Sequence, residues 1–203
     1  MQDESTAATT RVAATADVDP TARIGAGTSV WHLAQIREHA TLGENCNIGR
    51  GAYVGPEVVL GNNVKLQNYA LVYEPARLAD GVFIGPAAVL TNDEYPRAVT
   101  PEGRLKSGSD WTAVGVTIGE GAAIGARAVC VAPVHIGRWA LVAAGAVVTK
   151  DVPDFGLVVG VPGRRIGWVG RAGVPLEGKG DGLFVCPRTG ATYVESDGVL
   201  TEE

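Results

Sequence analysis

A run of polar residues from Thr91 to Arg97 offers the chemistry that this chain could do best. It reads Thr-Asn-Asp-Glu-Tyr-Pro-Arg and contains no histidine. The amide of Asn92 cannot act as a base, but its carbonyl oxygen can accept a hydrogen bond from an attacking amine and orient it. An amine needs less help than a hydroxyl, because with a pKa of about 8 it is partly neutral at pH 7. The segment therefore favours attack by an amine over attack by a hydroxyl.

A period of six residues runs along most of the chain. Every sixth residue from Val18 to Leu90 is aliphatic, and the fifth residue of each unit is small or β-branched except at Glu94. The pattern resumes at Thr112 and continues to the unit that begins at Val148, which gives twenty units. A strict period of six fits neither a helix nor an ordinary strand, so the sequence predicts a repeat architecture.

Three such units would close one triangular coil, with the first and fifth residues of each unit pointing inward. Stacked coils pair their strands at about 4.8 Å, so twenty units predict a prism roughly 30 Å tall. Residues eighteen apart then lie above one another, which places Asn92 about 5 Å from Glu74. A second column of His32, Arg50 and Asn68 is expected beside the first. Sixteen residues, 96–111, interrupt the period and predict an extruded loop, where function is often found.

Several segments carry a resemblance to a known family. VWHLAQIREHA, LADGVFIGPAAVLTNDEYPRAV and GAAIGARAVCVAPVHIGRWALVAAGAVVTKDVP are similar to the hexapeptide-repeat acyltransferases, and among them to the N-acetyltransferases that act on UDP-2-acetamido-3-amino-2,3-dideoxyglucuronate. The dTDP-3-amino-3,6-dideoxyhexose N-acetyltransferases share Thr-Asn-Asp-x-x-Pro-Arg. The likeness covers about residues 18–170. It implies an all-β fold, a left-handed parallel β-helix with the extruded loop and a small C-terminal β-hairpin; the left hand comes from the resemblance alone.

The resemblance also implies a function and a set of site residues. It implies an acetyl-CoA-dependent N-acetyltransferase that acetylates the amine, at C-3, of a UDP- or dTDP-linked amino sugar, without a metal. It further implies a homotrimer with its active sites at the subunit interfaces. Asn92 matches the family's active-site asparagine, and we expect Glu74 to hold the amine with it. The expected acceptor-binding residues are Gln67, Asn68, Tyr73, Arg97, His32 and Arg50. The expected coenzyme-binding residues are Ala128, Ala146, Lys150, Arg164 and Arg165, with Trp139 or Trp168 either covering the adenine or serving in packing.

Composition limits the partners and the organisation. A net charge of −5 over 203 residues argues against a nucleic-acid partner, and no apolar run is long enough for a membrane helix. The three cysteines do not suggest a disulfide framework, so a reducing cytoplasm is expected. We expect a disordered segment at residues 1–17, the β-helix at 18–153, and an exit segment with a hairpin cap at 154–203.

Three other functions compete with N-acetylation. An O-acetyltransferase is disfavoured by the loop without histidine, and a non-enzymatic solenoid would not need a polar loop and a terminal cluster of cations. A γ-type carbonic anhydrase would need three histidines on one zinc ion. His32, His39 and His135 occupy the third, fourth and last places of their units, so they cannot converge within one subunit.

Overall fold

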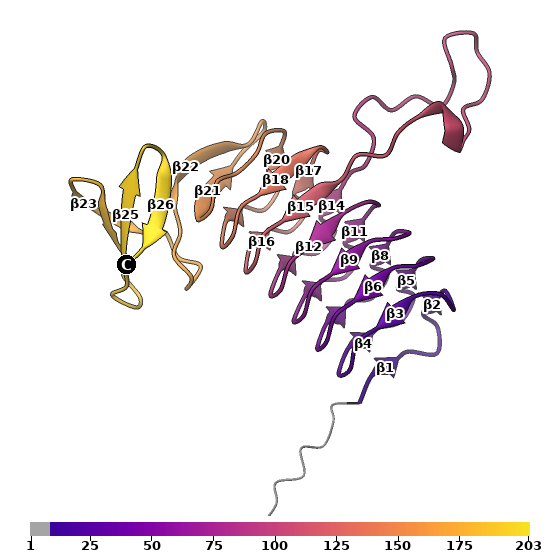
Figure 1. Cartoon of the computed structure of the whole chain (residues 1–203), viewed down its shortest axis with the longest axis horizontal. Coiled ribbons are helices and arrows are strands. Elements are labelled where there is room, and N and C mark those ends of the chain that lie inside the picture. Colours follow the sequence, from indigo (N-terminus) through magenta and orange to yellow (C-terminus); the bar gives the residue numbers. More distant parts are fainter. Residues whose placement is uncertain (1–8) are drawn as a thin grey trace, which may run out of the picture.

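The protein is a three-sided prism of short parallel strands, described for residues 9–203 by a computed structural model (Figure 1). Each side of the prism is one sheet. Sheet A contains β1 (Arg11–Val12), β4 (Ser29–Val30), β7 (Asn47–Ile48), β10 (Lys65–Leu66), β13 (Phe83–Ile84), β16 (Ala123–Ile124), β19 (Leu141–Val142), β21 (Gly156–Val159) and β22 (Arg164–Trp168). Sheet B contains β2 (Asp17–Val18), β5 (Gln35–Ile36), β8 (Tyr53–Val54), β11 (Leu71–Val72), β14 (Val89–Leu90), β17 (Val129–Cys130) and β20 (Val147–Val148). Sheet C contains β3 (Arg23–Ile24), β6 (Thr41–Leu42), β9 (Val59–Leu60), β12 (Arg77–Leu78), β15 (Val116–Ile118) and β18 (Val134–Ile136).

The strands pair with the register that the six-residue period predicts. Leu71 lies opposite both Tyr53 and Val89, eighteen residues away on either side. After the loop the register resumes, with Arg77 of β12 opposite Thr117 of β15. The architecture is a left-handed parallel β-helix, and the predicted fold is confirmed.

The core is a single column of aliphatic side chains along the axis of the prism. The first and fifth residues of the units are buried almost without exception from Val30 to Val152. Turns between the sides need left-handed backbone at the fourth place, where φ is positive even at Leu33, Asn45 and Tyr69. The axis is narrow, so alanine and valine occupy the inward corners.

The first coil begins earlier than expected. β1 and β2 lie within residues 11–18 and pair with β4 and β5, so the disorder expected up to residue 17 is wrong for this part. The period simply extends one unit further back, with Val12 in first place and Ala16 in fifth. The rest of that expectation, for residues 1–8, lies outside the described residues.

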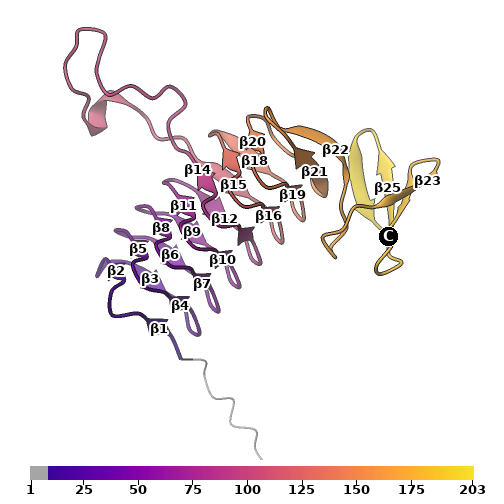
Figure 2. The same ribbon diagram turned by 180° about the vertical axis from the view of Figure 1, so that it is seen from behind.

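The C-terminal part is larger than the expected hairpin. β21 continues sheet A beside β19, and β22 turns back antiparallel to it. A separate antiparallel sheet follows, at the opposite end of the prism from β1 (Figure 2). Its strands are β23 (Glu177–Gly180), β24 (Leu183–Val185), β25 (Thr192–Ser196) and β26 (Val199–Glu202). Its apolar side packs against the prism end through a cluster of Phe155, Trp168, Cys186, Tyr193 and Leu200. Within residues 9–203, no helix has the length and hydrophobicity to cross a membrane.

Candidate active site

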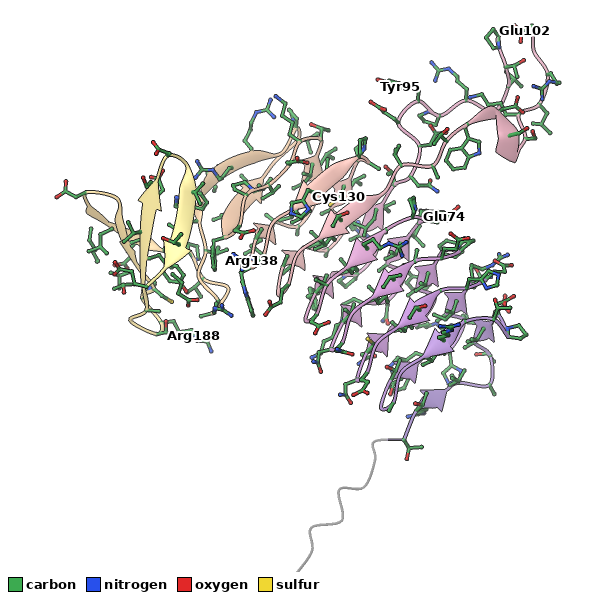
Figure 3. The ribbon with its side chains drawn as sticks, in the orientation of Figure 1. Glu74, Tyr95, Glu102, Cys130, Arg138 and Arg188 are labelled. Atoms are coloured by element: carbon green, nitrogen blue, oxygen red, sulfur yellow. The ribbon has the colours of Figure 1, made fainter. Side chains whose placement is uncertain are left out.

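The corner between sheets B and C, here the B/C corner, brings Glu74 and Asn92 together. The register that pairs Val72 with Leu90 stacks the two residues on adjacent coils, as their spacing predicts. Figure 3 shows Glu74 at the edge of the prism below the point where the chain leaves it. The backbone carbonyl oxygen of Asn92 accepts the N–H of Val114 at 3.0 Å, which closes the base of the loop.

The loop beyond Asn92 has internal structure of its own. Asp110, at the end of the short 3-10 helix η1 (Gly108–Asp110), forms an ion pair with Arg104 at 2.6 Å and accepts the N–H of Ser107 at 2.7 Å. These contacts, the Arg104 guanidinium first, hold the pKa of Asp110 far below its usual range. An antiparallel β-bridge between Val99 and Leu105 holds the two arms of the loop side by side. The loop is thus an ordered projection with Glu102 near its tip (Figure 3).

Glu74 lies in a partly apolar surrounding. Its Oε2 atom is buried and has no hydrogen-bond partner among the described residues. The ring of Tyr73 lies 5.0 Å from that of Tyr53 on the adjoining strand of sheet B. Burial, with the nearby carboxylate of Glu74 second, raises the pKa of Tyr53. This corner therefore combines a carboxylate, an amide and two phenol rings.

The second polar column lies at a different corner. His32, Arg50 and Asn68 follow strands of sheet A, so they stand at the A/B corner and not beside Glu74 as expected. Glu74 follows Asn68 by six residues, which is one whole side of the prism. The two columns therefore lie on opposite sides of sheet B, one at the corner where its strands begin and one at the corner where they end.

The A/B corner contains a cavity of about 330 Å³. Nδ1 of His32 lies 2.8 Å from the hydroxyl of Thr15, and Oδ1 of Asn68 accepts the N–H of Arg50 at 2.9 Å. Nε of Arg50 donates to the hydroxyl of Tyr69 at 3.3 Å. The lining residues are Trp31, His32, Asn47, Gly49, Arg50, Leu66, Gln67 and Asn68. Four of the expected acceptor-binding residues are thus gathered here.

Trp31 is a residue of this cavity that the sequence analysis did not identify. Its indole N–H donates to Oδ1 of Asn47 at 2.7 Å, and the guanidinium of Arg11 lies 4.7 Å from the ring centroid. The ring is therefore fixed in place and remains partly exposed. The sequence could have identified it, because Trp31 directly follows the inward Val30 and precedes His32, and so lies at the same corner as the expected column.

The remaining expected acceptor residues lie apart. Tyr73 belongs to the B/C corner, and Arg97 lies on the loop, where it lines a hollow with Lys106 and Trp111. The guanidinium of Arg97 donates to the carbonyl oxygen of Pro96 at 2.9 Å. Within the chain, the structure therefore divides these residues among two corners and the loop.

The three expected cations of the coenzyme site are together. Lys150, Arg164 and Arg165 line one hollow of about 260 Å³ between the last coil and β22. Arg165 also stacks on the ring of Trp168, 4.0 Å from its centroid. The other side of the hollow is formed by Asp151 and apolar residues.

Three of the other residues expected at the coenzyme site are buried within the chain. Ala128 and Ala146 are fully buried in the prism, and their N–H and C=O groups bond within the chain. Trp168 is buried in the C-terminal cluster. Trp139 lies beneath the guanidinium of Arg171, 4.6 Å from the ring centroid. Trp168 thus serves in packing, whereas Trp139 is only partly buried and lines a hollow with Arg138 and Arg171.

The histidines do not form a common site. His32 stands at the A/B corner, His39 at the B/C corner, and His135 points outward from β18 on sheet C. In residues 9–203, no group of three histidine, cysteine, aspartate or glutamate side chains could hold a metal ion.

Comparisons with known proteins agree with this architecture. Residues 21–56 match the family described as bacterial transferase hexapeptide (six repeats), and residues 115–150 match the hexapeptide repeat of succinyl-transferase. The bifunctional protein GlmU of Jannaschia sp. (strain CCS1) is 35% identical over 166 residues, covering 74% of this chain and 35% of that protein. The chain spans about a third of the length of the curated relatives it matches.

Solved structures provide two further comparisons. LpxA from Bacteroides fragilis, a UDP-N-acetylglucosamine acyltransferase, has a TM-score of 0.63 at 18% identity, covering 79% of this chain and 61% of LpxA. A mutant of perosamine N-acetyltransferase from Caulobacter crescentus has a TM-score of 0.49 at 27% identity, covering 79% of this chain and 58% of that one. The chain is a hexapeptide-repeat protein of the β-helix class. Its repeats are those of the bacterial hexapeptide transferases.

Proposed function

We propose that the protein is an acetyl-CoA-dependent N-acetyltransferase that acetylates the amine, at C-3, of a nucleotide-linked amino sugar. The observation that supports this best is the B/C corner, where Glu74 and Asn92 stack at the base of the loop with no histidine in the loop. Such a pair suits an amine, which brings its own lone pair and needs orientation more than deprotonation.

The reaction follows from these groups. The carboxylate of Glu74 and the side-chain carbonyl of Asn92 accept hydrogen bonds from the amine and aim its lone pair at the thioester carbon. A carbon–nitrogen bond forms and the carbon–sulfur bond breaks. The proton released from nitrogen passes to the departing thiolate, so the products are the amide and the free thiol of CoA. A backbone N–H of a neighbouring subunit stabilises the oxyanion of the intermediate.

Coenzyme binding is assigned to the hollow of Lys150, Arg164 and Arg165. Lys150 and Arg164 supply positive charge for the phosphates of acetyl-CoA. The guanidinium of Arg165, stacked on Trp168, is held ready on the same side. Lys150 follows β20 of sheet B, so it stands at the same corner of the prism as Glu74 and Asn92.

The acceptor is assigned to the cavity at the A/B corner. Trp31 offers a ring face for the nucleotide base, and Arg50 offers a cation for its phosphates. Gln67 and Asn68 add amide groups, and His32 adds a ring nitrogen. Tyr73 and Arg97 contact the sugar near the reacting amine. UDP- and dTDP-linked sugars both supply a base for the Trp31 ring and phosphates for Arg50.

A homotrimer unites these separate parts. The outward residues of sheet B form an apolar row that runs from coil to coil: Tyr53, Leu71, Val89, Val129 and Val147. If three prisms turn sheet B toward a threefold axis, the B/C corner of one subunit meets the A/B corner of the next. The reacting pair would then face the acceptor cavity of the neighbouring subunit.

A panel of amino-sugar nucleotides tests the function. The protein is incubated with acetyl-CoA and with UDP- or dTDP-linked sugars that carry the amine at C-3 or at C-4, and thiol release is measured. We expect release with a 3-amino sugar and a product heavier by one acetyl group. The proposal would be overturned if no amino sugar caused thiol release. It would also be overturned if only matched sugars with a hydroxyl in place of the amine were acetylated.

A further inference from the structure

A repeated hydrogen bond links neighbouring coils at the corners of the prism. In it, the side-chain oxygen of a residue two places after an inward strand or bridge residue accepts the N–H of the corresponding residue one coil earlier. The described residues include four such bonds, and each acceptor lies over a second-place glycine where a Cβ would overlap it. They are Asn62 to Glu44 N–H at 2.8 Å, Asn68 to Arg50 N–H at 2.9 Å, Asp80 to Asn62 N–H at 2.7 Å and Asp154 to Arg138 N–H at 2.7 Å.

Glu74 has the position of such an acceptor but no donor. Its Oε2 lies over Gly55, where a Cβ would overlap it as at the other four sites. The third-place residue below is Pro56, which has no N–H. Oε2 is therefore buried and unpaired among the described residues. An oxygen in that state costs stability until some group supplies a donor.

The same corner contains an internal comparison two coils earlier. Glu38 stands over Pro20, which likewise has no N–H. There the carboxylate is bound by the adjacent Arg37, with Nη2 at 2.6 Å and Nε at 3.1 Å, and this ion pair lowers the pKa of Glu38. Beside Glu74 the corresponding second-place residue is Tyr73, which brings no positive charge. In the described chain, only at Glu74 do a missing N–H and a missing cation coincide.

We propose that Pro56 is a positioning residue: by removing the N–H that would anchor the buried Oε2 of Glu74, it leaves this carboxylate free to turn toward the amine of the acceptor. The inference rests on the proposed function. A backbone N–H at position 56 would donate to the carboxylate and compete with the amine. A hydrogen bond to a charged group is equivalent to roughly tenfold or more in binding.

The test uses Pro56→Ala, which restores the N–H, with Pro20→Ala as its matched control. For Pro56→Ala we expect kcat/KM for the amino sugar to fall by about tenfold, with KM for acetyl-CoA unchanged. Pro20→Ala should behave as the wild type, because Arg37 already holds Glu38. In a Glu74→Gln background the Pro56→Ala change should have no further effect. Equal behaviour of the two proline variants, or full additivity with Glu74→Gln, would overturn the inference.

A second measurement does not depend on activity. Amide hydrogen exchange at position 56 should be slow in Pro56→Ala and faster when Glu74→Ala is added. Fast exchange in the single variant overturns the inference even if the wild type acetylates its acceptor. If the wild type acetylates no acceptor, the proposed function is overturned. Amide hydrogen exchange at position 56 then still shows whether an N–H at this position binds Glu74.

A comparison of glutamates covers the case in which Pro56→Ala does not fold. Glu74→Gln should then lower kcat/KM by at least about tenfold and Glu38→Gln should not. Equal losses in the two variants would contradict the role given to Pro56.

Discussion

Asn92 stands where the chain leaves the prism, and its two polar groups have separate tasks. The backbone carbonyl accepts the N–H of Val114 and fixes the loop base. In the proposed reaction, the side chain holds the acceptor amine. Replacing Asn92 by alanine keeps the backbone bond and removes the side-chain contact.

We expect Asn92→Ala to lower kcat on the order of 10²-fold, because a misplaced nucleophile loses most of the benefit of orientation. Steady-state thiol release measures this, and thermal unfolding should show an unchanged midpoint. Glu94→Ala, an exposed change two residues away, is the control and should leave kcat intact. A normal rate for Asn92→Ala would remove Asn92 from the mechanism.

The three cysteines should differ in reactivity. All are free and buried, but burial raises the pKa of Cys130 to about 12 and raises that of Cys46. A hydrogen bond from Thr189, with Arg188 nearby, lowers the pKa of Cys186. Because the thiolate is the reactive form, a disulfide reagent at pH 8 should label Cys186 first, through local opening of the C-terminal sheet, and the others only after the prism unfolds. Cys186→Ser should abolish labelling of the native protein; labelling of native Cys130 would contradict the prediction.

At the scale of the element, the outer part of the loop contains one ion pair in addition to its backbone bridge between Val99 and Leu105. Asp110 pairs with Arg104, so Asp110→Asn should loosen residues 96–111 while the β-helix stays folded. Limited trypsin digestion should then cut faster after Arg104 or Lys106. Because the pKa of Asp110 is lowered in the folded protein, the ion pair stabilises the loop above about pH 4. This stabilisation is lost only as acid protonates the carboxylate of the folded protein. Glu94→Gln is the control, and equal cleavage of both variants would contradict the role of the pair.

The elements could be predicted from the sequence to the extent that they follow the period of six. The register of Leu71 with Val89 and the stacking of Glu74 under Asn92 both follow from multiples of eighteen. His32 and Glu74 are 42 residues apart, which is two coils and one side, so the sequence also contained the separation of the two corners that the expectation overlooked.

Other parts had weaker signals. The first coil was missed because Val12 and Ala16 lie among small polar residues. β23 reads Glu-Gly-Lys-Gly and has no strand pattern, so the fourth strand of the C-terminal sheet could not be foreseen. The unpaired state of Glu74 depends on what lies below it, and it becomes visible only when Pro56 is seen in that place.

At the scale of the whole molecule, sheet B is the side best suited to another copy. Its outward row is apolar from Tyr53 to Val147, whereas the outward row of sheet C includes Arg23, Arg77 and His135.

We therefore expect Val129→Asp to convert the proposed trimer into monomers and to abolish the proposed activity, since in that assembly each site needs two subunits. Light scattering after size exclusion gives the mass. Val59→Asp introduces the same charge at the same place of a unit on sheet C and should remain trimeric and active. A trimeric Val129→Asp variant would exclude sheet B as the interface.

The closed base of the loop has a consequence for how such proteins diversify. The strands on either side keep their register across the insertion, and a single N–H···O bond joins its two ends. Lengthening a tethered segment costs little, about 0.6 kcal/mol for each doubling. This corner can therefore accept insertions and deletions, and in the proposed enzyme acceptor preference can change there while the scaffold stays constant.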